Sequence, residues 1–372
     1  MSAGLYIHIP FCKSRCIYCD FYSQTEIQKE NYIPSLLAEA EYYSDKWEEN
    51  TFNSLYFGGG TPSLLTPEEI SLIVNFLKSR YHFSDDVEIT LECNPDDIDE
   101  KYSSQVAATG INRISIGVQS FENNILRFLS RRHNAVQTIR AVEHFQKAGI
   151  ENINIDLIFG IPGLTSEAWE EQLKTAVSLH VKHISAYMLT SYENTMLCSL
   201  NNQMKIQMPG DEDCFIQFCK AGEYLSASGM PRYEISNYAV PGYESRHNQK
   251  YWKGKPWLGL GPSAHTYKKN QRSANPADND LYLRDTVKFI STKSTEILNE
   301  KAIFNEYIMN HLRTLKGINT EDLKKNFPQY FEHFNRSINM LKTEWYEYKS
   351  NKFYLSEQGL FVSDYITSKL FL

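Results

Sequence analysis

Residues 5–20 read LYIHIPFCKSRCIYCD, and they place three cysteines directly after a pattern typical of a β-strand. The run LYIHI is short and rich in β-branched and aromatic residues, as strands are. Cys12, Cys16 and Cys19 follow it, although the whole chain of 372 residues has only seven cysteines. Chemistry in parallel α/β folds gathers at the carboxyl ends of the strands. The stretch therefore predicts a strand that leads into a site built on sulfur.

This strand pattern is the first of six, and helical patterns lie between them. Strands that alternate with helices pair in parallel through right-handed crossovers. The sequence thus predicts an α/β fold, a partial (β/α)6 barrel of the TIM type. The other strand patterns are SLYFG (54–58), VEITLEC (87–93), RISIGVQ (113–119), NINIDLIF (152–159) and HISAYML (183–189), and the helical patterns lie around 30–47, 67–80, 134–148 and 167–179.

Several of these strands have one apolar and one polar face, whereas the strands of an ordinary parallel sheet are apolar on both. In the fifth strand, Ile153 and Ile155 point to one side and Asn154 and Asp156 to the other, because side chains alternate along a strand. The third and fourth strands show the same split. The pattern predicts a barrel whose apolar outer rows meet the helices and whose polar inner rows line a cavity for hydrophilic ligands.

The alternation weakens after about residue 190, and two further regions are predicted. Residues 1–240 form the barrel core, and residues 241–279 form a connecting region that contains the motifs HNQKYW and GLGPSAH. The polar run KKNQRSANPADND marks a boundary. Residues 280–372 are helical and aromatic, and they end in a β-hairpin pattern followed by a helix. This region is predicted to form a smaller, mainly helical domain that resembles a winged helix.

The composition limits the functional classes. A formal net charge of −7 gives no electrostatic footprint for nucleic acid. The chain has no signal-peptide pattern at its start and no run of eighteen apolar residues, so we expect no transmembrane segment and a cytoplasmic location. An odd number of cysteines in a reducing compartment argues against disulfides. The thiols outside the first motif are interpreted as small buried hydrophobes; these are Cys93, Cys198, Cys214 and Cys219.

Three clustered cysteines can belong to either of two kinds of metal site, a structural zinc site or an iron–sulfur cluster. A structural zinc site needs four ligands, and no second cysteine pair or histidine pair follows at a suitable spacing. Three thiolates instead suit an iron–sulfur cluster with one iron left open. The spacing C-x3-C-x2-C after a strand resembles the signature of the radical S-adenosylmethionine (radical SAM) superfamily. That resemblance implies that Cys12, Cys16 and Cys19 hold a [4Fe-4S] cluster whose fourth iron binds S-adenosylmethionine.

The same resemblance implies further cofactor contacts at the ends of the following strands. The run FGGGTPSLL (57–65) ends the second strand, and its glycines alone are equally compatible with a bare turn. Polar side chains at the ends of the next three strands are equally compatible with a water-filled barrel. By resemblance, the residues that contact S-adenosylmethionine are Gly59, Gly60, Thr61, Glu92, Gln119, Arg131 and Asp156.

Within the superfamily, nearly the whole chain is similar to the oxygen-independent coproporphyrinogen oxidase family. The similarity is carried by YIHIPFCKSRCIYCDF, GGGTPS, LECNPDD, IGVQSF and IDLIFGIPG. It implies that Tyr6 and Tyr18 border the cluster and cofactor. The decarboxylating branch of this family carries a further cysteine two residues after the third cluster cysteine, where this chain has Phe21, and a longer segment before the cluster, where only eleven residues precede Cys12.

A third difference favours the other branch of the family, the heme chaperones called HemW. HNQKYW (247–252) contains H-N-x-x-Y-W, which resembles the motif of that branch. His247 offers an imidazole for heme iron, and its aromatic neighbours offer flat apolar faces to a porphyrin. Ordinary packing of these residues and ligation by His265 are left open as alternatives.

The sequence therefore predicts a heme chaperone with heme, a [4Fe-4S] cluster and S-adenosylmethionine as its cofactors. Its predicted partners are heme and acceptor hemoproteins such as respiratory enzymes at the membrane surface, and a homodimer is left open. The alternative function is that of an oxygen-independent coproporphyrinogen III oxidase. We expect no coproporphyrinogen oxidase activity, and whether the chain catalyses another reaction is left open.

Overall fold

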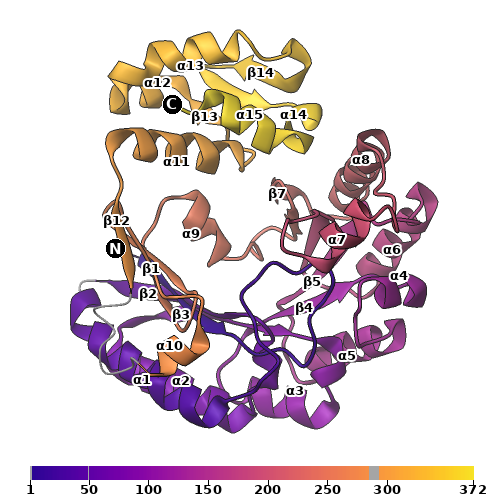
Figure 1. Ribbon diagram of the computed structural model, residues 1–372, viewed down its shortest axis with the longest axis vertical. Helices are drawn as coiled ribbons and strands as arrows, with labels where there is room; N and C mark the ends of the chain where they lie inside the picture. Colours follow the sequence, from indigo (N-terminus) through magenta and orange to yellow (C-terminus); the bar gives the residue numbers. More distant parts are fainter. Residues whose placement is uncertain (1, 49, 285–292) are drawn as a thin grey trace.

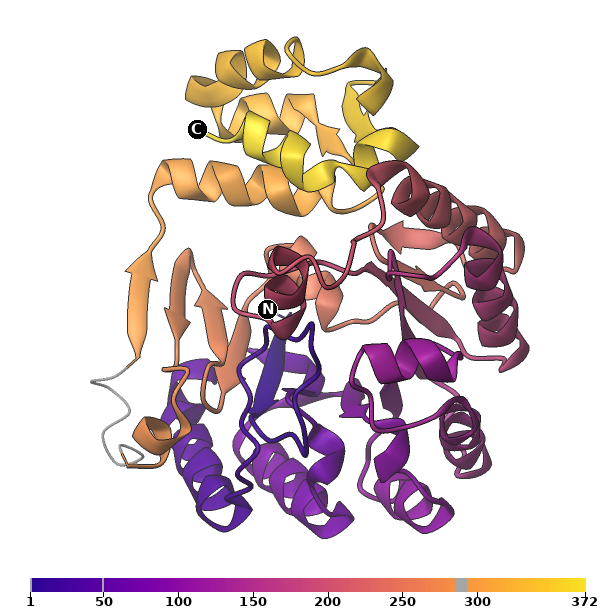
Figure 2. The ribbon, with the colours of Figure 1, turned by 45° about the vertical axis from the view of Figure 1, so that its right-hand side comes forward.

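Six parallel strands form the centre of the main sheet, and they begin and end close to the predicted positions. The computed structural model describes residues 2–48, 50–284 and 293–372. Adjacent members of the six pair in parallel in chain order, which confirms the predicted α/β fold with a partial barrel (Figures 1 and 2). The strands are β1 (Ser2–Ile9), β2 (Thr51–Gly59), β3 (Phe83–Cys93), β4 (Arg113–Gln119), β5 (Ile153–Phe159) and β6 (His183–Met188).

Helices connect these strands and cover the outer face of the sheet (Figure 2). Several begin at a capping residue that the sequence supplies. Thr66 and Glu69 form a capping box at the start of α2, and Asn134 and Gln137 form one at the start of α5, so exposed backbone N–H groups are satisfied there. The connecting helices are α1 (Lys29–Ser44), α2 (Pro67–Arg80), α3 (Glu100–Ala107), α4 (Asn123–Phe128), α5 (Ala135–Lys147) and α6 (Ser166–Ser178).

The two faces of the strands separate as their alternation predicts. Ile153 and Ile155 are fully buried in the apolar core between sheet and helices. Asn154 and Asp156 face the other way and form hydrogen bonds with polar side chains of neighbouring strands; Asn154 Nδ2 donates to Ser115 Oγ at 2.8 Å. The inner rows are polar and largely shielded from solvent, so the barrel has a hydrogen-bonded lumen.

The sheet continues beyond the six predicted strands at both edges. In the described part of the chain it has twelve strands in the order β12-β11-β10-β9-β1-β2-β3-β4-β5-β6-β8-β7. The segment at 241–279, expected as a connecting region, supplies three of the added strands, and the first of them, β9, pairs in parallel with β1. The added strands are β7 (Arg232–Glu234), β8 (Asn237–Ala239), β9 (Trp257–Leu260), β10 (His265–Lys268), β11 (Gln271–Ala274) and β12 (Ser294–Ile297).

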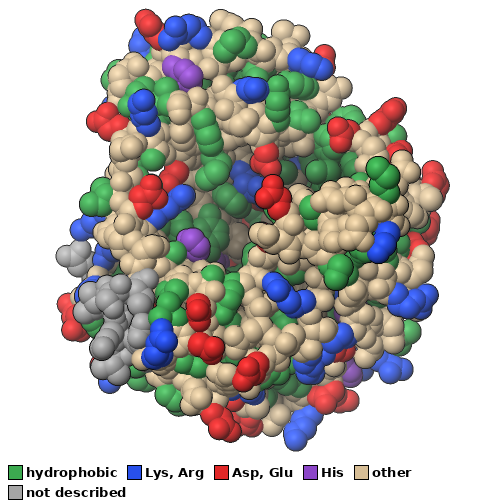
Figure 3. Space-filling model, in the orientation of Figure 1, with side chains coloured by type: hydrophobic (Ala, Val, Ile, Leu, Met, Phe, Trp, Pro, Cys, Tyr) green, Lys and Arg blue, Asp and Glu red, His purple; other side chains and the backbone are tan. Residues whose placement is uncertain are grey.

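Four more helices lie between β6 and the C-terminal unit in the described part of the chain. They are α7 (Met196–Asn202), α8 (Asp211–Ala227), α9 (Asn248–Trp252) and α10 (Asn279–Arg284). Figure 1 shows α9 between the barrel strands and the C-terminal unit. Figure 3, in the same orientation, shows a hollow near this region with hydrophobic side chains in its wall and charged side chains at its rim.

The C-terminal unit has its own apolar core, in which Phe304, Phe334 and Phe353 are fully buried. The predicted hairpin and following helix are present. Residues 285–292, within the predicted C-terminal region, lie outside the described residues. The elements are α11 (Glu300–Leu312), β13 (Ile318–Asn319), α12 (Thr320–Asn326), α13 (Phe331–Ile338), β14 (Tyr346–Lys349), β15 (Lys352–Leu355), α14 (Glu357–Phe361) and α15 (Ser363–Leu370). Among the helices described, none has the length and apolar character needed to cross a bilayer.

Candidate functional site

The three predicted cluster cysteines lie on one loop that leaves the sheet at the end of β1. Backbone hydrogen bonds close the neck of this loop, from Cys12 N to Gln24 O (2.9 Å) and from Gln24 N to Pro10 O (2.7 Å). The three thiols are half-buried and form no disulfide. Within residues 2–48, 50–284 and 293–372, no three His, Cys, Asp or Glu side chains surround a common point as metal ligands do. The loop supplies suitable donor atoms, and cluster binding requires them to turn toward one centre.

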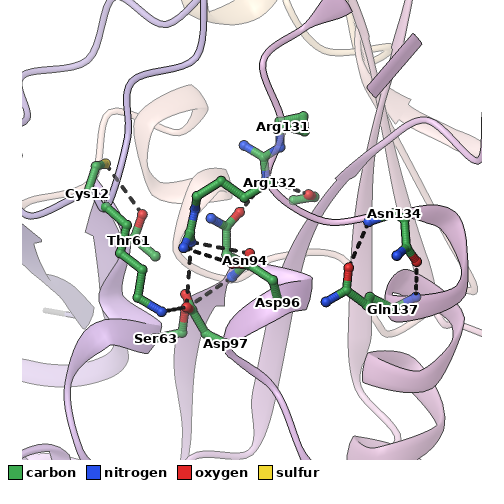
Figure 4. Close-up of polar contacts among 12 residues, drawn as sticks. Cys12, Thr61, Ser63, Asn94, Asp96, Asp97, Arg131, Arg132, Asn134 and Gln137 are labelled. Atoms are coloured by element: carbon green, nitrogen blue, oxygen red, sulfur yellow. Dashed lines mark hydrogen bonds and ion pairs between the residues drawn. The ribbon is translucent and has the colours of Figure 1, made fainter. Parts of the chain in front are cut away.

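Two of these sulfurs already accept hydrogen bonds from residues of other loops, one after β2 and one between α4 and α5. Thr61 Oγ1 donates to Cys12 Sγ at 3.4 Å, a contact drawn in Figure 4, and Arg131 Nη1 donates to Cys16 Sγ at 3.3 Å. Hydrogen bonds to the sulfurs are the outer contacts that orient the ligands of a cluster and adjust its reduction potential. The donor set and its surroundings therefore fit an iron–sulfur cluster.

The glycine turn at the end of β2 lies directly against the cysteine loop. Gly59 has φ +108°, in the left-handed region that disfavours side chains, and a Cβ there would come within 2.7 Å of the His8 ring. A Cβ on Gly60 would lie 2.7 Å from the Phe11 carbonyl oxygen and 3.1 Å from Cys12 Sγ. The turn can approach the loop this closely only because these positions are glycine.

Two carboxylates project into the lumen from β3 and β5. Burial raises the pKa of Glu92 to about 7, and the negative charge of Asp156 adds to the rise, whereas a hydrogen bond from the Tyr56 hydroxyl (2.7 Å) opposes it. Burial also raises the pKa of Asp156, although hydrogen bonds from Ser185 and Asn154 oppose the change. A cationic ligand in this lumen would meet two carboxyl groups that share one cationic neighbour, Arg113.

Arg131 connects β4 to the cysteine loop. Its Nη2 donates to the Gly117 carbonyl oxygen at 2.8 Å and to Asn94 Oδ1, while its Nη1 reaches Cys16. Its Nε is buried and has no partner among the described residues. Gln119 ends β4 nearby with φ +68°, an uncommon conformation for a residue other than glycine. Arg131 is therefore positioned by three contacts and retains one buried donor.

The run that follows Glu92 supplies supporting residues that the sequence analysis did not single out. Figure 4 shows them beside the cysteine loop. Arg132 pairs with Asp96 at 2.8 Å, and Asp97 accepts hydrogen bonds from Lys13 (2.6 Å) and Ser63 (2.9 Å). The adjacent acids in LECNPDD and the paired arginines in SRR were the available signals. These contacts join the cysteine loop, the glycine turn and the Arg131 segment.

The two predicted tyrosines occupy different places. The Tyr6 ring lies in the lumen, where its hydroxyl is 3.1 Å from His8 Nδ1 and its ring stacks on Tyr56 with centroids 6.2 Å apart. Tyr18 lies on the cysteine loop between two of the cysteines, and burial raises its pKa. Tyr6 therefore lines the barrel interior, whereas Tyr18 forms part of the loop.

His247 lies near the amino-terminal ends of the strands rather than beside the cysteine loop. The residue is 1% exposed, and both ring nitrogens have partners, Ser54 Oγ at 3.1 Å from Nδ1 and the Tyr251 hydroxyl at 2.9 Å from Nε2. Its backbone N–H donates to the carboxylate of Glu88 at 3.3 Å. Burial, reinforced by nearby cations, lowers the pKa of His247 to about 3. The motif HNQKYW thus closes one end of the lumen.

His265, the competing ligand, has a different environment. It begins β10 and its side chain is exposed, although partial burial and nearby Arg272 and Lys293 lower its pKa. The residue's carbonyl oxygen accepts a hydrogen bond from Trp257 Nε1 at 3.0 Å. The structure brings together the cysteine loop, the glycine turn, the lumen acids and Arg131. His247 lies at the other end of the lumen, whereas His265 is near enough to His8, whose ring lies against the glycine turn, to help lower the pKa of His8.

The chain is similar to several known proteins. Residues 6–176 match the family model of the radical SAM superfamily. The chain is 32% identical over 331 residues to the protein named heme chaperone HemW of Lactococcus lactis, which covers 88% of this chain and 86% of that protein. It is 32% identical over 341 residues to the HemW of Bacillus subtilis (90% and 88%) and 37% identical over 270 residues to that of Haemophilus influenzae (70% and 69%).

A solved structure shares the fold over almost the whole chain. The coproporphyrinogen III oxidase HemN from Escherichia coli, described as a radical SAM enzyme, matches with a TM-score of 0.85 and 21% identity, covering 99% of this chain and 89% of that one. At this identity the match supports the fold alone, including the barrel and the C-terminal unit. The family model and the sequence relatives show that this chain belongs to the radical SAM superfamily and, within it, to the HemW family.

Proposed function

We propose that this protein is a heme chaperone, which binds heme and transfers it to acceptor hemoproteins. The observation that carries the proposal is the 32% identity to a protein named heme chaperone HemW across 88% of this chain. A structural feature adds support. Phe21, which stands where the decarboxylating branch has a further cysteine, is 69% exposed near the cysteine loop and offers an apolar surface without a thiol. A cytoplasmic location and acceptors at the membrane surface belong to the same proposal.

We also propose that Cys12, Cys16 and Cys19 hold a [4Fe-4S] cluster and that S-adenosylmethionine binds in the lumen beside it. When bound, such a cluster supplies a site for one-electron transfer. The chain's own residues would bind the cofactor and orient the cluster ligands. Thr61 and Arg131 donate hydrogen bonds to the sulfurs, and the glycine turn brings its backbone directly against Cys12. Glu92 and Asp156 accept hydrogen bonds from donor groups of the cofactor, and Tyr6 and Gln119 complete the wall.

Heme ligation by His247 requires a local change, because both ring nitrogens are already hydrogen-bonded inside the barrel. Tyr251 and Trp252 are part of α9, and this helix lies between the barrel and the C-terminal unit (Figure 1). Outward movement of this short helix would break the contact to Ser54 and expose the imidazole together with the two aromatic rings, whereas release from the Tyr251 hydroxyl, which moves on the same helix, requires the side chains to rotate. His265 needs no such movement, so it is the alternative ligand.

The deciding experiment compares heme binding with decarboxylation in one preparation. The full chain is reconstituted anaerobically with iron and sulfide, then titrated with heme while the absorption spectrum is recorded. The same preparation receives coproporphyrinogen III, a reductant and S-adenosylmethionine. A chaperone saturates with heme at a fixed stoichiometry and forms no decarboxylated product. Absence of saturable heme binding, or catalytic product formation, would replace the chaperone proposal by that of an oxidase, whose fold this chain shares.

A further inference from the structure

A basic cavity lies at the amino-terminal ends of β1 and β2, at the opposite end of β1 from the cysteine loop. It encloses about 350 Å3. Segment 246–255, which contains α9, supplies every charged residue among the described ones that line it, and each of them is a cation. The lining residues are Ser2, Asn53, Arg246, Gln249, Lys250, Lys253 and Lys255.

The most buried member of this wall is Lys250. The residue is 5% exposed. Its Nζ donates a hydrogen bond at 3.0 Å to Ser2 Oγ, which is a neutral acceptor. Burial of an ammonium group is costly unless a negative charge accompanies it. Burial lowers the pKa of Lys250 to about 8, and the charges of Lys253, Lys255 and Arg246 add to the effect, while Glu88 opposes it. The wall thus carries positive charge that is only partly balanced.

The neighbouring acids are largely committed elsewhere. The carboxylate of Glu88 accepts hydrogen bonds from the backbone N–H groups of Arg246 (2.9 Å) and His247 (3.3 Å). Asp86 pairs with the Arg246 guanidinium at 2.8 Å on the surface. Lys253 Nζ donates to Gln249 Oε1 and Lys250 Nζ donates to Ser2 Oγ, both neutral groups, so each of these ammonium groups keeps further N–H donors for a ligand. This concentration of positive charge occurs on a chain whose formal net charge is −7.

We propose that this cavity binds the phosphate group of an anionic ligand. Three lysines act as compact point charges, which suit the dense charge of a phosphate. The one arginine of the wall is already paired with Asp86. The serine hydroxyl and the amides of Asn53 and Gln249 supply neutral hydrogen bonds. A volume of about 350 Å3 exceeds that of phosphate alone and leaves room for a small organic part.

The phosphate group has two chemical sources, a soluble phosphate ester and a phospholipid headgroup. Calorimetry of the full-length protein at low ionic strength, with pyrophosphate and glycerol 3-phosphate as probes, tests the first source. Co-sedimentation with phosphatidylglycerol vesicles, compared with phosphatidylcholine vesicles, tests the second. Saturable binding in either arm supports the proposal and identifies the source. Succinate, a dicarboxylate whose charge is close to that of glycerol 3-phosphate at neutral pH, should bind at least about tenfold more weakly than glycerol 3-phosphate if the preference is for phosphate.

Variants of the cavity lysines test whether the phosphate probes bind in this cavity. The double variant Lys253→Gln/Lys255→Gln changes two exposed side chains, so it leaves folding intact, and it should weaken binding by about tenfold or more. Lys250→Met should do the same if its melting temperature shows that it folds. The matched control, Lys101→Gln, removes an exposed lysine from α3 and should leave the affinity unchanged. Absence of binding in both arms, or an equal loss in the Lys101 variant, would overturn the proposal.

Discussion

The guanidinium of Arg131 and the sulfur of Cys16 lie in hydrogen-bond contact at 3.3 Å although 115 positions separate them in the chain. Cluster iron binds cysteine sulfur, and a hydrogen bond from a second residue orients such a ligand. Arg131 is held in place by the Gly117 carbonyl oxygen and Asn94, both on the neighbouring strand ends. The contact therefore joins the cysteine loop to the wall of the barrel.

Replacing any one of Cys12, Cys16 and Cys19 by serine should abolish the cluster. Wild-type protein reconstituted anaerobically should hold about four irons and four sulfides per chain. The control is Cys198→Ser, which removes another half-buried thiol, located on α7. Iron and sulfide analysis together with the visible absorption spectrum reports the result. Retention of a full cluster by a loop variant, or stoichiometric zinc in the wild type, would contradict the assignment.

Removing the positive charge beside Cys16 should lower the reduction potential of the cluster. Arg131→Met deletes a hydrogen bond and a cation that both stabilise the more negatively charged, reduced state. A redox titration followed by electron paramagnetic resonance measures the potential. Arg140→Met, on the outer helix α5, is the control, since it leaves the cysteine loop untouched. Equal potentials in Arg131→Met and wild type would show that the contact does not persist once the cluster is bound.

Glu92 and Asp156 should each be needed for tight binding of S-adenosylmethionine. The changes Glu92→Gln and Asp156→Asn retain shape but remove the charge, and the expected loss is about ten- to a hundredfold in affinity. Glu88→Gln is a matched control, because Glu88 lies on the same strand as Glu92 and is also buried, but it binds the segment around His247. Calorimetry on reconstituted protein measures the effect. Similar affinities for all three variants would argue that the cofactor does not use these acids.

The raised pKa of Glu92 also predicts a pH-dependent cost in stability. The ordinary value is 4.5 and the folded value is about 7, so the folded state favours the protonated form. That stabilisation is fully present below pH 4.5 and is lost as the pH rises through about 7. Glu92→Gln should therefore be more stable than wild type at pH 8, by at most roughly 3 kcal/mol, and nearly equal to it at pH 4.5. Urea unfolding of the cluster-free protein at both values measures this difference; a pH-independent gap would contradict the shift.

The sequence predicts the barrel well because each strand and helix is recognised from residues that are close together in the chain. Each strand can be recognised from its own alternation, and the inner position of Asp156 follows from its neighbours Ile155 and Leu157. The position of His247 could not be found in this way. Its contact with Ser54 spans 193 positions, and the pairing of β9 with β1 likewise joins the two ends of the core. Such long-range contacts depend on which distant strand still has an unpaired edge, and a local sequence pattern carries no information about that edge.

The hydrogen bonds of His247 offer a test of which histidine binds heme. If His247 is the ligand, its ring must first leave Ser54 Oγ and the Tyr251 hydroxyl. Tyr251→Phe removes one restraint and keeps the aromatic ring, and Ser54→Ala removes the other. Each net hydrogen bond is worth about 1 kcal/mol, so each change should tighten heme binding by about fivefold. His247→Ala should abolish this gain and change the heme spectrum.

Ligation by His265 predicts a different set of results. Because the His265 side chain is exposed on β10, Tyr251→Phe and Ser54→Ala should then leave heme affinity unchanged, and His265→Ala should weaken it. His180→Ala, which replaces a histidine in the turn after α6, is the control for the loss of an imidazole. Heme titrations of the five variants, followed by absorbance under reducing conditions, distinguish the two ligands. Tighter binding after release of the His247 ring would mean that α9 restrains heme ligation as well as closing the barrel.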